Sequence, residues 1–229
     1  MRLFKDKKVT DNMPMSQNNA QQINEFFGKY KLKHFKKGEY LMRAGSEPEG
    51  IYSLTQGVVR QVVTTKKGEE LTVNTYHPPA FIPLTWALDD IANKYDYIAF
   101  TDVDAYVAPA KETTEFLKSN PEVLFDLTKR LLSGLNGLLV KTEHLMDHSA
   151  QERLVLTLLQ LAYRYGSSES GTKQVQIHLL LTHRELATFS GLSRETVSNE
   201  MKSLSNGGYI TNEHRTVVIA DLTQLEELL

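Results

Sequence analysis

The sequence predicts an α+β fold: an N-terminal antiparallel β-roll (jelly roll), a long dimerisation helix and a C-terminal winged helix-turn-helix. Short β-rich runs separated by glycines predict the roll. Leucines at intervals of seven predict the long helix. Helix caps on either side of a turn glycine predict two crossing helices. We therefore expect a flexible polar arm at residues 1–22, a β-roll sensor domain at 23–118, a dimerisation helix and hinge at 119–148, and a winged helix-turn-helix domain at 149–229.

The composition excludes several classes of protein. A chain of 229 residues can hold two modest domains, each with its own core. The absence of cysteine excludes disulfides, cysteine-held iron–sulfur clusters and cysteine nucleophiles. No apolar run approaches the length of a membrane span, and no apolar stretch follows the basic start, as it would in a secretory signal. We expect a cytoplasmic protein without a membrane partner, whose net charge of −2 confines any nucleic-acid surface to a local patch.

The N-terminal half changes from polar to helical to β-rich. Residues 1–22 are polar and lysine-rich, as in a mobile arm. A short helical pattern then runs from Ile23 to about Tyr30. Lys66–Glu69 has the composition of a hairpin loop, in which Gly68 supplies positive φ. The expected strands are Ile51–Leu54, Val58–Thr64, Leu71–Tyr76 and Ala105–Val107.

A long helix is expected after Asn120-Pro121-Glu122, because proline suits the first turn. Its leucine spacing indicates pairing with a second copy of the chain; the alternative is a helix buried on its own domain. The expected dimerisation residues are Leu124, Leu131, Leu135, Leu138 and Leu145. We prefer the pairing because a second stripe is available to face the protomer's own roll, namely Leu132, Leu139 and Met146. Asp147–Ala150 then interrupts the pattern as a hinge, and Gln151–Tyr165 is a second amphipathic helix.

Thr182–Asn206 carries the pattern of a helix-turn-helix. Thr182 and Glu185 have the spacing of a capping box, which predicts a helix start. Gly191 stands where the turn requires positive φ, and Ser193 can cap a second helix. Two β-rich runs follow around the polar tip Asn212–Arg215, as in a wing that lies on a nucleic-acid backbone.

One face of the second helix has the chemistry of a major-groove reader. Arginine can donate a fork to guanine, glutamate can accept from cytosine, and asparagine can pair with adenine. The alternative is a solvated helix face with mixed charges. The candidate contacts to double-stranded DNA are Arg194, Glu195, Ser198, Asn199, Lys202, Thr182, His183, Arg184 and Ser193. From residue 149 onward the chain has seven Lys and Arg residues and nine Asp and Glu residues. Each chain therefore gains little DNA affinity from phosphate neutralisation, and a dimer would raise that affinity.

The order of these parts, together with Ser193-Arg194-Glu195-Thr196-Val197-Ser198, resembles the Crp/Fnr family of bacterial transcription regulators. The resemblance covers roughly residues 23–229. It implies a homodimer on a pseudo-palindromic operator, RNA polymerase as the partner of an activator, and an unknown small-molecule effector in the β-roll. It also implies base contacts by Arg194 and Glu195. The family's third base-reading position is usually arginine, and here it is Asn199.

The sensor departs from the cyclic-AMP-binding members of that family. Those members share a Gly-Glu-Leu segment followed by an Arg-Ser pair, and here Phe81–Leu88 and Lys94–Tyr97 stand in their place. There is no glycine to expose backbone amides, no arginine between Arg60 and Arg130, and Asp96 would repel a phosphate. We therefore do not expect cyclic AMP to bind through the usual cassette. The iron–sulfur sensing of the Fnr branch is excluded by the absence of cysteine.

Other candidate sites are weaker. Four aromatic residues are candidates for an effector pocket, because flat ligands stack on aromatic rings: Tyr76, Trp86, Tyr95 and Tyr97. The alternative, which we prefer, is that they form barrel core. His144 and His148 are four residues apart on the long helix, as in one half of a metal site, but we expect surface polar groups and no metal. No catalytic motif is present, so we do not expect an enzyme. The alternative function is a ligand-binding β-roll that regulates a protein partner, with the helix-turn-helix as a docking surface.

Overall fold

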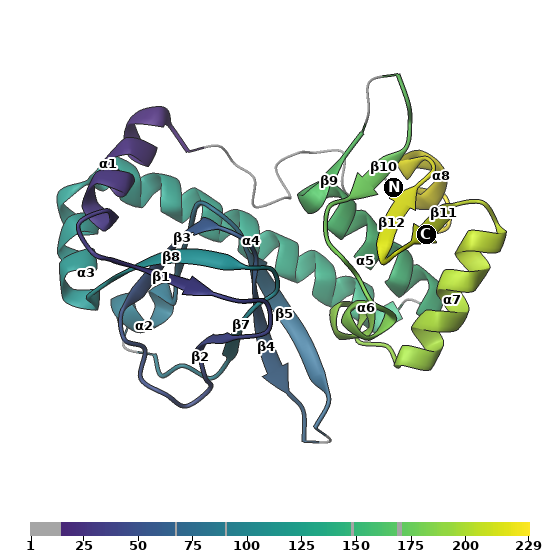
Figure 1. Ribbon diagram of the computed structural model, residues 1–229, viewed down its shortest axis with the longest axis horizontal. Coiled ribbons are helices and arrows are strands. Elements are labelled where there is room, and N and C mark those ends of the chain that lie inside the picture. Colours follow the sequence, from purple (N-terminus) through teal and green to yellow (C-terminus); the bar gives the residue numbers. More distant parts are fainter. Residues whose placement is uncertain (1–14, 67, 90, 148, 169–170) are drawn as a thin grey trace. The chain divides into compact units, whose positions relative to one another are not determined.

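The computed structural model describes residues 15–229 except residues 67, 90, 148 and 169–170, and it leaves out the side chains of residues 140–141, 143–147 and 213. The chain forms two compact units, which divide between Lys129 and Arg130 inside one long helix. The ribbon in Figure 1 shows the elements of both units. The expected arm lies mostly outside the described residues. The division of the chain into four functional segments remains a prediction.

The first unit is an antiparallel β-roll with helices packed on it. One four-stranded sheet has the order β1-β8-β3-β6, and the other has the order β2-β7-β4-β5. The strands are β1 (Lys31–Phe35), β2 (Tyr40–Met42), β3 (Ile51–Gln56), β4 (Val59–Thr64), β5 (Glu70–Tyr76), β6 (Ala80–Ile82), β7 (Asp96–Ala99) and β8 (Val103–Ala108). The helices are α1 (Gln17–Phe27), α2 (Leu84–Asp89), α3 (Ala110–Ser119) and the first part of α4 (Pro121–Asp147). This architecture confirms the predicted roll and long helix.

Two apolar clusters hold this unit together. The first contains buried residues from both sheets, including Tyr52, Val59 and Tyr97. The second joins α1, α3 and α4 to the roll through Phe27, Phe81, Leu117, Val123 and Leu127. Asn19 adds a polar link between the helices, because its Nδ2 donates to Asp126 Oδ2 at 2.6 Å.

Several elements of this unit were not predicted. Helix α1 begins at Gln17 and not at Ile23, because the hydroxyl of Ser16 accepts from the backbone N–H of Asn19 and caps it. Strand β1 is rich in lysine and half-exposed, so it lacks an apolar alternation. Helix α3 follows Pro109, which makes no side-chain capping bond and so leaves no cap pattern in the sequence.

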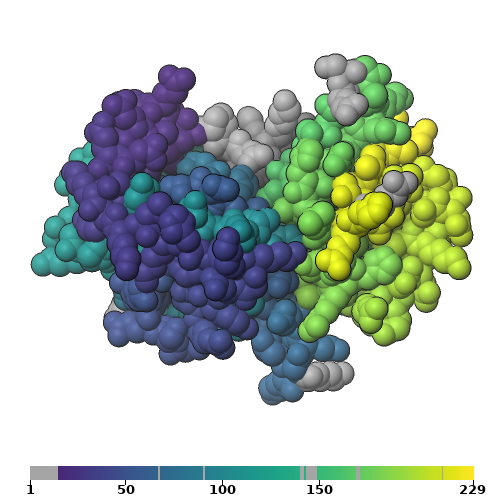
Figure 2. Space-filling model, viewed as in Figure 1, coloured from purple at the N-terminus to yellow at the C-terminus, as the bar shows by residue number. Residues whose placement is uncertain are grey.

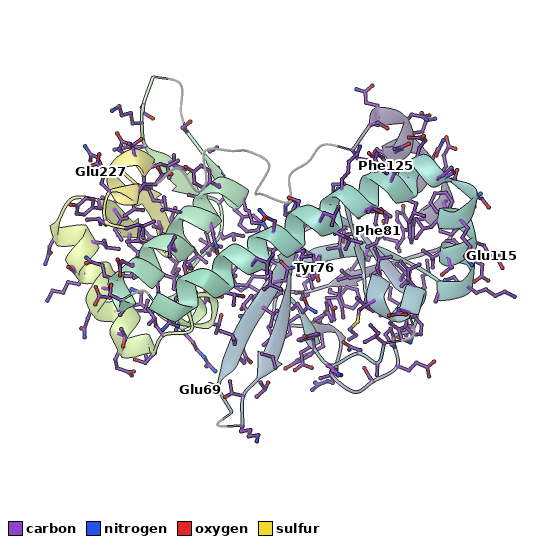
Figure 3. The ribbon with its side chains drawn as sticks, turned by 180° about the vertical axis from the view of Figure 1, so that it is seen from behind. Glu69, Tyr76, Phe81, Glu115, Phe125 and Glu227 are labelled. Atoms are coloured by element: carbon purple, nitrogen blue, oxygen red, sulfur yellow. The ribbon has the colours of Figure 1, made fainter. Side chains whose placement is uncertain are left out.

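The β4–β5 hairpin projects from the body of the roll and is visible in the ribbon and on the surface (Figures 1 and 2). Its loop is closed by Thr65, whose N–H donates to the carbonyl of Glu69 at 2.8 Å. Gly68 has φ 80°, which confirms the predicted left-handed position. In Figure 3, Tyr76 marks the last residue of β5, and Glu69 marks the loop just before its first residue.

Helix α4 buries only a narrow stripe against the roll. Val123 is fully buried and Leu127 nearly so. The predicted seam is exposed in the single chain: Leu124 by 37%, Leu131 by 56%, Leu135 by 52% and Leu138 by 46%. The side chain of Leu145 lies outside the described residues. Phe125, seen on the same helix in Figure 3, is also exposed.

The expectation that Leu132 and Leu139 face the protomer's own roll was wrong. Both side chains are exposed, by 61% and 60%. The residues that contact the roll are Val123 and Leu127, and Leu132 follows Val123 by nine residues. At about 100° per residue, Leu132 therefore lies on the opposite side of the helix. Met146 lies outside the described side chains.

The second unit is a winged helix-turn-helix. A four-stranded antiparallel sheet has the order β11-β12-β10-β9. Its elements are α5 (Ala150–Tyr165), β9 (Gly166–Ser167), β10 (Val175–Ile177), α6 (His183–Ser190), α7 (Arg194–Asn206), β11 (Ile210–Glu213), β12 (Thr216–Ile219) and α8 (Leu222–Glu226). Helix α5 forms the centre of the core, with Leu154, Val155 and Leu158 fully buried. In the described part of the chain, no helix is both long and apolar enough to cross a membrane.

Candidate nucleic-acid interface

Helix α6 starts at the predicted capping box. The Thr182 hydroxyl accepts from the backbone N–H of Glu185 at 3.1 Å. In return, Glu185 Oε2 accepts from the backbone N–H of Thr182 at 2.7 Å and from its hydroxyl at 2.9 Å. Two otherwise unpaired amides at the helix start are thereby satisfied.

The turn between α6 and α7 also follows the prediction. Gly191 adopts φ 65° and ψ 28°, and its N–H donates to the carbonyl of Ala187. Ser193 caps α7, because its hydroxyl accepts from the backbone N–H of Thr196 at 3.1 Å. Buried side chains on the inner faces hold the two helices together: Leu186, Val197, Met201 and Leu204.

The outer face of α7 carries the candidate base readers. Arg194, Glu195, Asn199 and Lys202 are exposed, and Ser198 is half-buried. Within the described part of the chain, none of these five side chains makes a hydrogen bond or an ion pair. Their donors and acceptors are therefore available to a ligand on this face.

A surface hollow of about 500 Å³ adjoins the start of α6 and α7. It is lined by Leu181, Thr182, His183, Arg184, Arg194, Asn212 and Arg215. Three arginines, from α6, α7 and the wing, thus line one hollow. A group of cations of this kind suits a backbone phosphate, which arginine can bind with two parallel hydrogen bonds.

The wing tip is fixed beside this hollow. Strands β11 and β12 pair as far as Glu213 and Thr216, which leaves His214 and Arg215 as the turn. The carbonyl of Arg215 accepts from the backbone N–H of Leu181 at 2.8 Å. Sequence reasoning placed a polar wing tip on the nucleic-acid backbone but did not group Arg215 with the start of α6. That link depends on a backbone contact between residues distant in sequence.

The four predicted effector residues do not form one group. Tyr97 is buried in the first apolar cluster, with Tyr76 and Tyr95 packed against it, whereas Trp86 packs against the second cluster. Gln61 joins two of the rings: its Nε2 donates to the Tyr97 hydroxyl at 3.1 Å, and its Oε1 accepts from the Tyr76 hydroxyl at 3.0 Å. Burial, and then the neighbouring Tyr76, raise the pKa of Tyr97 well above its ordinary value.

The stretch that replaces the phosphate cassette forms β6 and α2. Asp96 in β7 accepts from the backbone N–H of Ala44 at 2.9 Å, so its carboxylate has a structural role. Among the described residues, no cluster of three potential metal ligands occurs. The histidines considered as half of a metal site, His144 and His148, lie outside the described side chains.

Two family models match this chain, one for each part of the fold. The cyclic nucleotide-binding domain matches residues 32–120, and the Crp-like helix-turn-helix domain matches residues 152–228. The transcriptional regulator SdrP of Thermus thermophilus is 29% identical over 196 residues, which cover 85% of this chain and 92% of that protein. The CRP-like cAMP-activated global transcriptional regulator of Mycobacterium tuberculosis is 25% identical, and the match covers 83% of this chain and 84% of that protein.

Solved structures agree with these matches. The transcriptional regulator TTHA1359 of the CRP/FNR family, from Thermus thermophilus, superimposes with a TM-score of 0.70 at 28% identity, covering 86% of this chain and 97% of that one. A CooA mutant from Carboxydothermus hydrogenoformans has the same fold, with a TM-score of 0.74 at 18% identity, covering 94% and 98%. The roll, the long helix and the winged helix-turn-helix therefore define a DNA-binding transcription regulator. The chain belongs to the Crp/Fnr family.

Proposed function

We propose that two copies of this chain bind a pseudo-palindromic operator, with Ser193–Asn206 of each copy in successive major grooves. The outer face of α7 carries this proposal, because its polar side chains are unengaged within the described chain and form one contiguous surface. In this arrangement Arg194 donates to guanine, Glu195 accepts from cytosine and Asn199 pairs with adenine.

The hollow beside α7 takes a backbone phosphate in this proposal. Arg184, Arg194 and Arg215 line it together with His183 and the first turn of α6. The hydroxyls of Thr182 and Ser193 are already used as helix caps, so their part is to hold the backbone amides of α6 and α7 toward the DNA.

The homodimer is supported by the exposed leucines of α4. Apolar patches of this kind on a single chain mark surfaces that another protein covers. Leu131, Leu135 and Leu138 repeat at the spacing that knobs-into-holes packing requires. A dimer also compensates for the low positive charge of the DNA-binding domain, because binding two half-sites doubles the number of phosphate contacts and raises the affinity for DNA.

Residues 23–118 are assigned as the sensor of the regulator, 119–148 as its dimerisation helix and hinge, and 149–229 as its DNA-binding domain. The effector, for which the β-roll is the assigned site, is not cyclic AMP held by the usual cassette, since Phe81–Leu88 provides no arginine and no glycine. The proposed location is the cytoplasm, where an activator would also meet RNA polymerase.

The test is a mobility shift of the purified protein on duplexes enriched from a random library, repeated over a range of salt concentrations. The regulator is expected to select a two-fold-symmetric sequence and to lose affinity steeply as salt rises. The alternative, in which the helix-turn-helix docks a protein partner, predicts no enrichment of any duplex. Sedimentation equilibrium at micromolar concentration tests the dimer separately.

A further inference from the structure

Arg153, in the first turn of α5, lies outside the DNA-contacting set but is bonded to the turn of the helix-turn-helix. Its Nη2 donates to the carbonyl of Ser190 at 2.8 Å and to the carbonyl of Gly191 at 2.9 Å. Ser190 is the last residue of α6, and Gly191 is its left-handed cap. One guanidinium therefore holds the point at which the chain leaves α6 for α7.

The charge of Arg153 fits the end of α6 and not the start of α5. The C-terminal carbonyls of a helix carry a partial negative charge, and a cation there is stabilising. Helix α6 has no basic residue in its own last turn, so Arg153 supplies that cation from another element. At the start of α5 the dipole has the opposite sign and disfavours a cation, so stabilising α5 does not account for this residue.

The buried Nε of Arg153 also indicates that this side chain serves the turn and not the packing of α5. Its Nε is buried and has no hydrogen-bond partner among the described residues, which carries a desolvation cost. An aliphatic residue would fill this position without that cost. The guanidinium offsets this cost through its two hydrogen bonds to the carbonyls of Ser190 and Gly191.

We infer that Arg153 is a positioning residue for DNA reading: by holding the Ser190 and Gly191 carbonyls, it sets the direction in which α7 leaves the turn. Only Leu192 and Ser193 separate Gly191 from Arg194, so a shift at the turn passes directly to the first base readers. Displacements of about 1 Å are enough to misalign bidentate contacts with base edges. The inference rests on the proposed DNA binding by α7.

The experiment compares wild type, Arg153→Ala, Arg153→Lys and Arg164→Ala, the last being a control on the same helix. Each protein is titrated with the operator duplex selected by wild type and with a shuffled duplex of the same composition. The readout is the ratio of the two affinities. A merely structural defect lowers the active fraction and weakens both duplexes equally, so it leaves this ratio unchanged.

Arg153→Ala is expected to reduce the ratio about tenfold or more, in line with the loss of hydrogen bonds from a charged group. Arg164→Ala should stay within about twofold of wild type. A folded Arg153→Ala protein with the wild-type ratio would overturn the inference. If that variant does not fold, Arg153→Lys provides the test. Its ammonium group reaches less far than the guanidinium and is expected to lower the ratio about threefold. An unchanged ratio for Arg153→Lys would then overturn the inference. Absence of operator selection by wild type would contradict the proposed function instead.

Discussion

The backbone N–H of Leu181 donates to the carbonyl of Arg215 across 2.8 Å, which fixes the wing tip beside the first turn of α6. Arg215 therefore lines the same hollow as Arg184 and Arg194. Because this hollow is assigned to a phosphate, Arg215→Ala should weaken binding to selected and shuffled duplexes by the same factor. It should also make the slope of log affinity against log salt shallower by about 2, because each copy in the proposed dimer loses one phosphate contact. Titrations at four salt concentrations measure both effects, and a base-dependent loss would contradict the assignment.

Arg194→Ala is expected to behave differently, because its side chain is assigned to a base edge as well as the hollow. The affinity for the selected operator should fall by about 1–3 kcal/mol, and discrimination at one base pair per half-site should relax. Competition with single-base operator variants measures this. An equal loss of affinity for every operator variant would show that Arg194 does not contact a base.

The capping box at the start of α6 predicts a stability effect. Thr182→Ala removes the hydroxyl that accepts from Glu185 N–H and should cost about 1 kcal/mol of unfolding free energy in urea. Thr182→Ser, which keeps the hydroxyl, is the matched control and should remain close to wild type. Comparable losses in both variants would show that the methyl group matters and the cap does not.

The seam on α4 predicts a change of assembly. Leu131→Lys places a charge in the proposed interface and should shift sedimentation equilibrium from dimer to monomer, with a loss of operator affinity. Leu132→Lys is the control, because Leu132 is similarly exposed but belongs to the second stripe and not to the proposed seam. If both variants remained dimeric, the seam would be wrong; if only Leu132→Lys dissociated, the interface would lie on the other stripe.

The Asn19–Asp126 bond predicts a pH dependence. The hydrogen bond from Asn19, the largest cause, holds the pKa of Asp126 below its ordinary value. A carboxylate with a lowered folded pKa stabilises the fold above its unfolded pKa, about 3.9, and this contribution is lost as pH falls through the folded value. Asn19→Ala should therefore destabilise the roll most at neutral pH, with a smaller difference from wild type below about pH 4. Urea unfolding at both pH values tests this, and a constant difference would contradict it.

The parts of the site that could be predicted from sequence are those set by near neighbours. Thr182 with Glu185, the turn at Gly191 and the cap at Ser193 each depend on spacings of a few residues, and the structure confirms them. The glycine-punctuated strands β3, β4 and β5 were likewise found close to their observed limits.

The parts that could not be predicted depend on contacts between distant residues. Arg153 meets Gly191 across 38 positions, and no local pattern indicates that bond. The inner face of α4 is decided by where Val123 and Leu127 meet the roll, so the leucine pattern alone assigned Leu132 wrongly. Trp86 shares its aromatic character with Tyr97, but strand and helix placement puts it in another cluster.

In the proposed complex, the residues that favour folding stability at the wing turn differ from those that favour operator affinity. His214 and Arg215 adopt φ 51° and 68°. This left-handed conformation costs a non-glycine residue about 1–2 kcal/mol. A two-residue hairpin turn of this kind favours Asn-Gly. A laboratory screen for heat resistance would therefore enrich Asn-Gly at this turn, whereas a screen for operator affinity would retain the arginine. In the proposed complex, stability and affinity therefore favour different residues at these two positions, and this sequence has the cation.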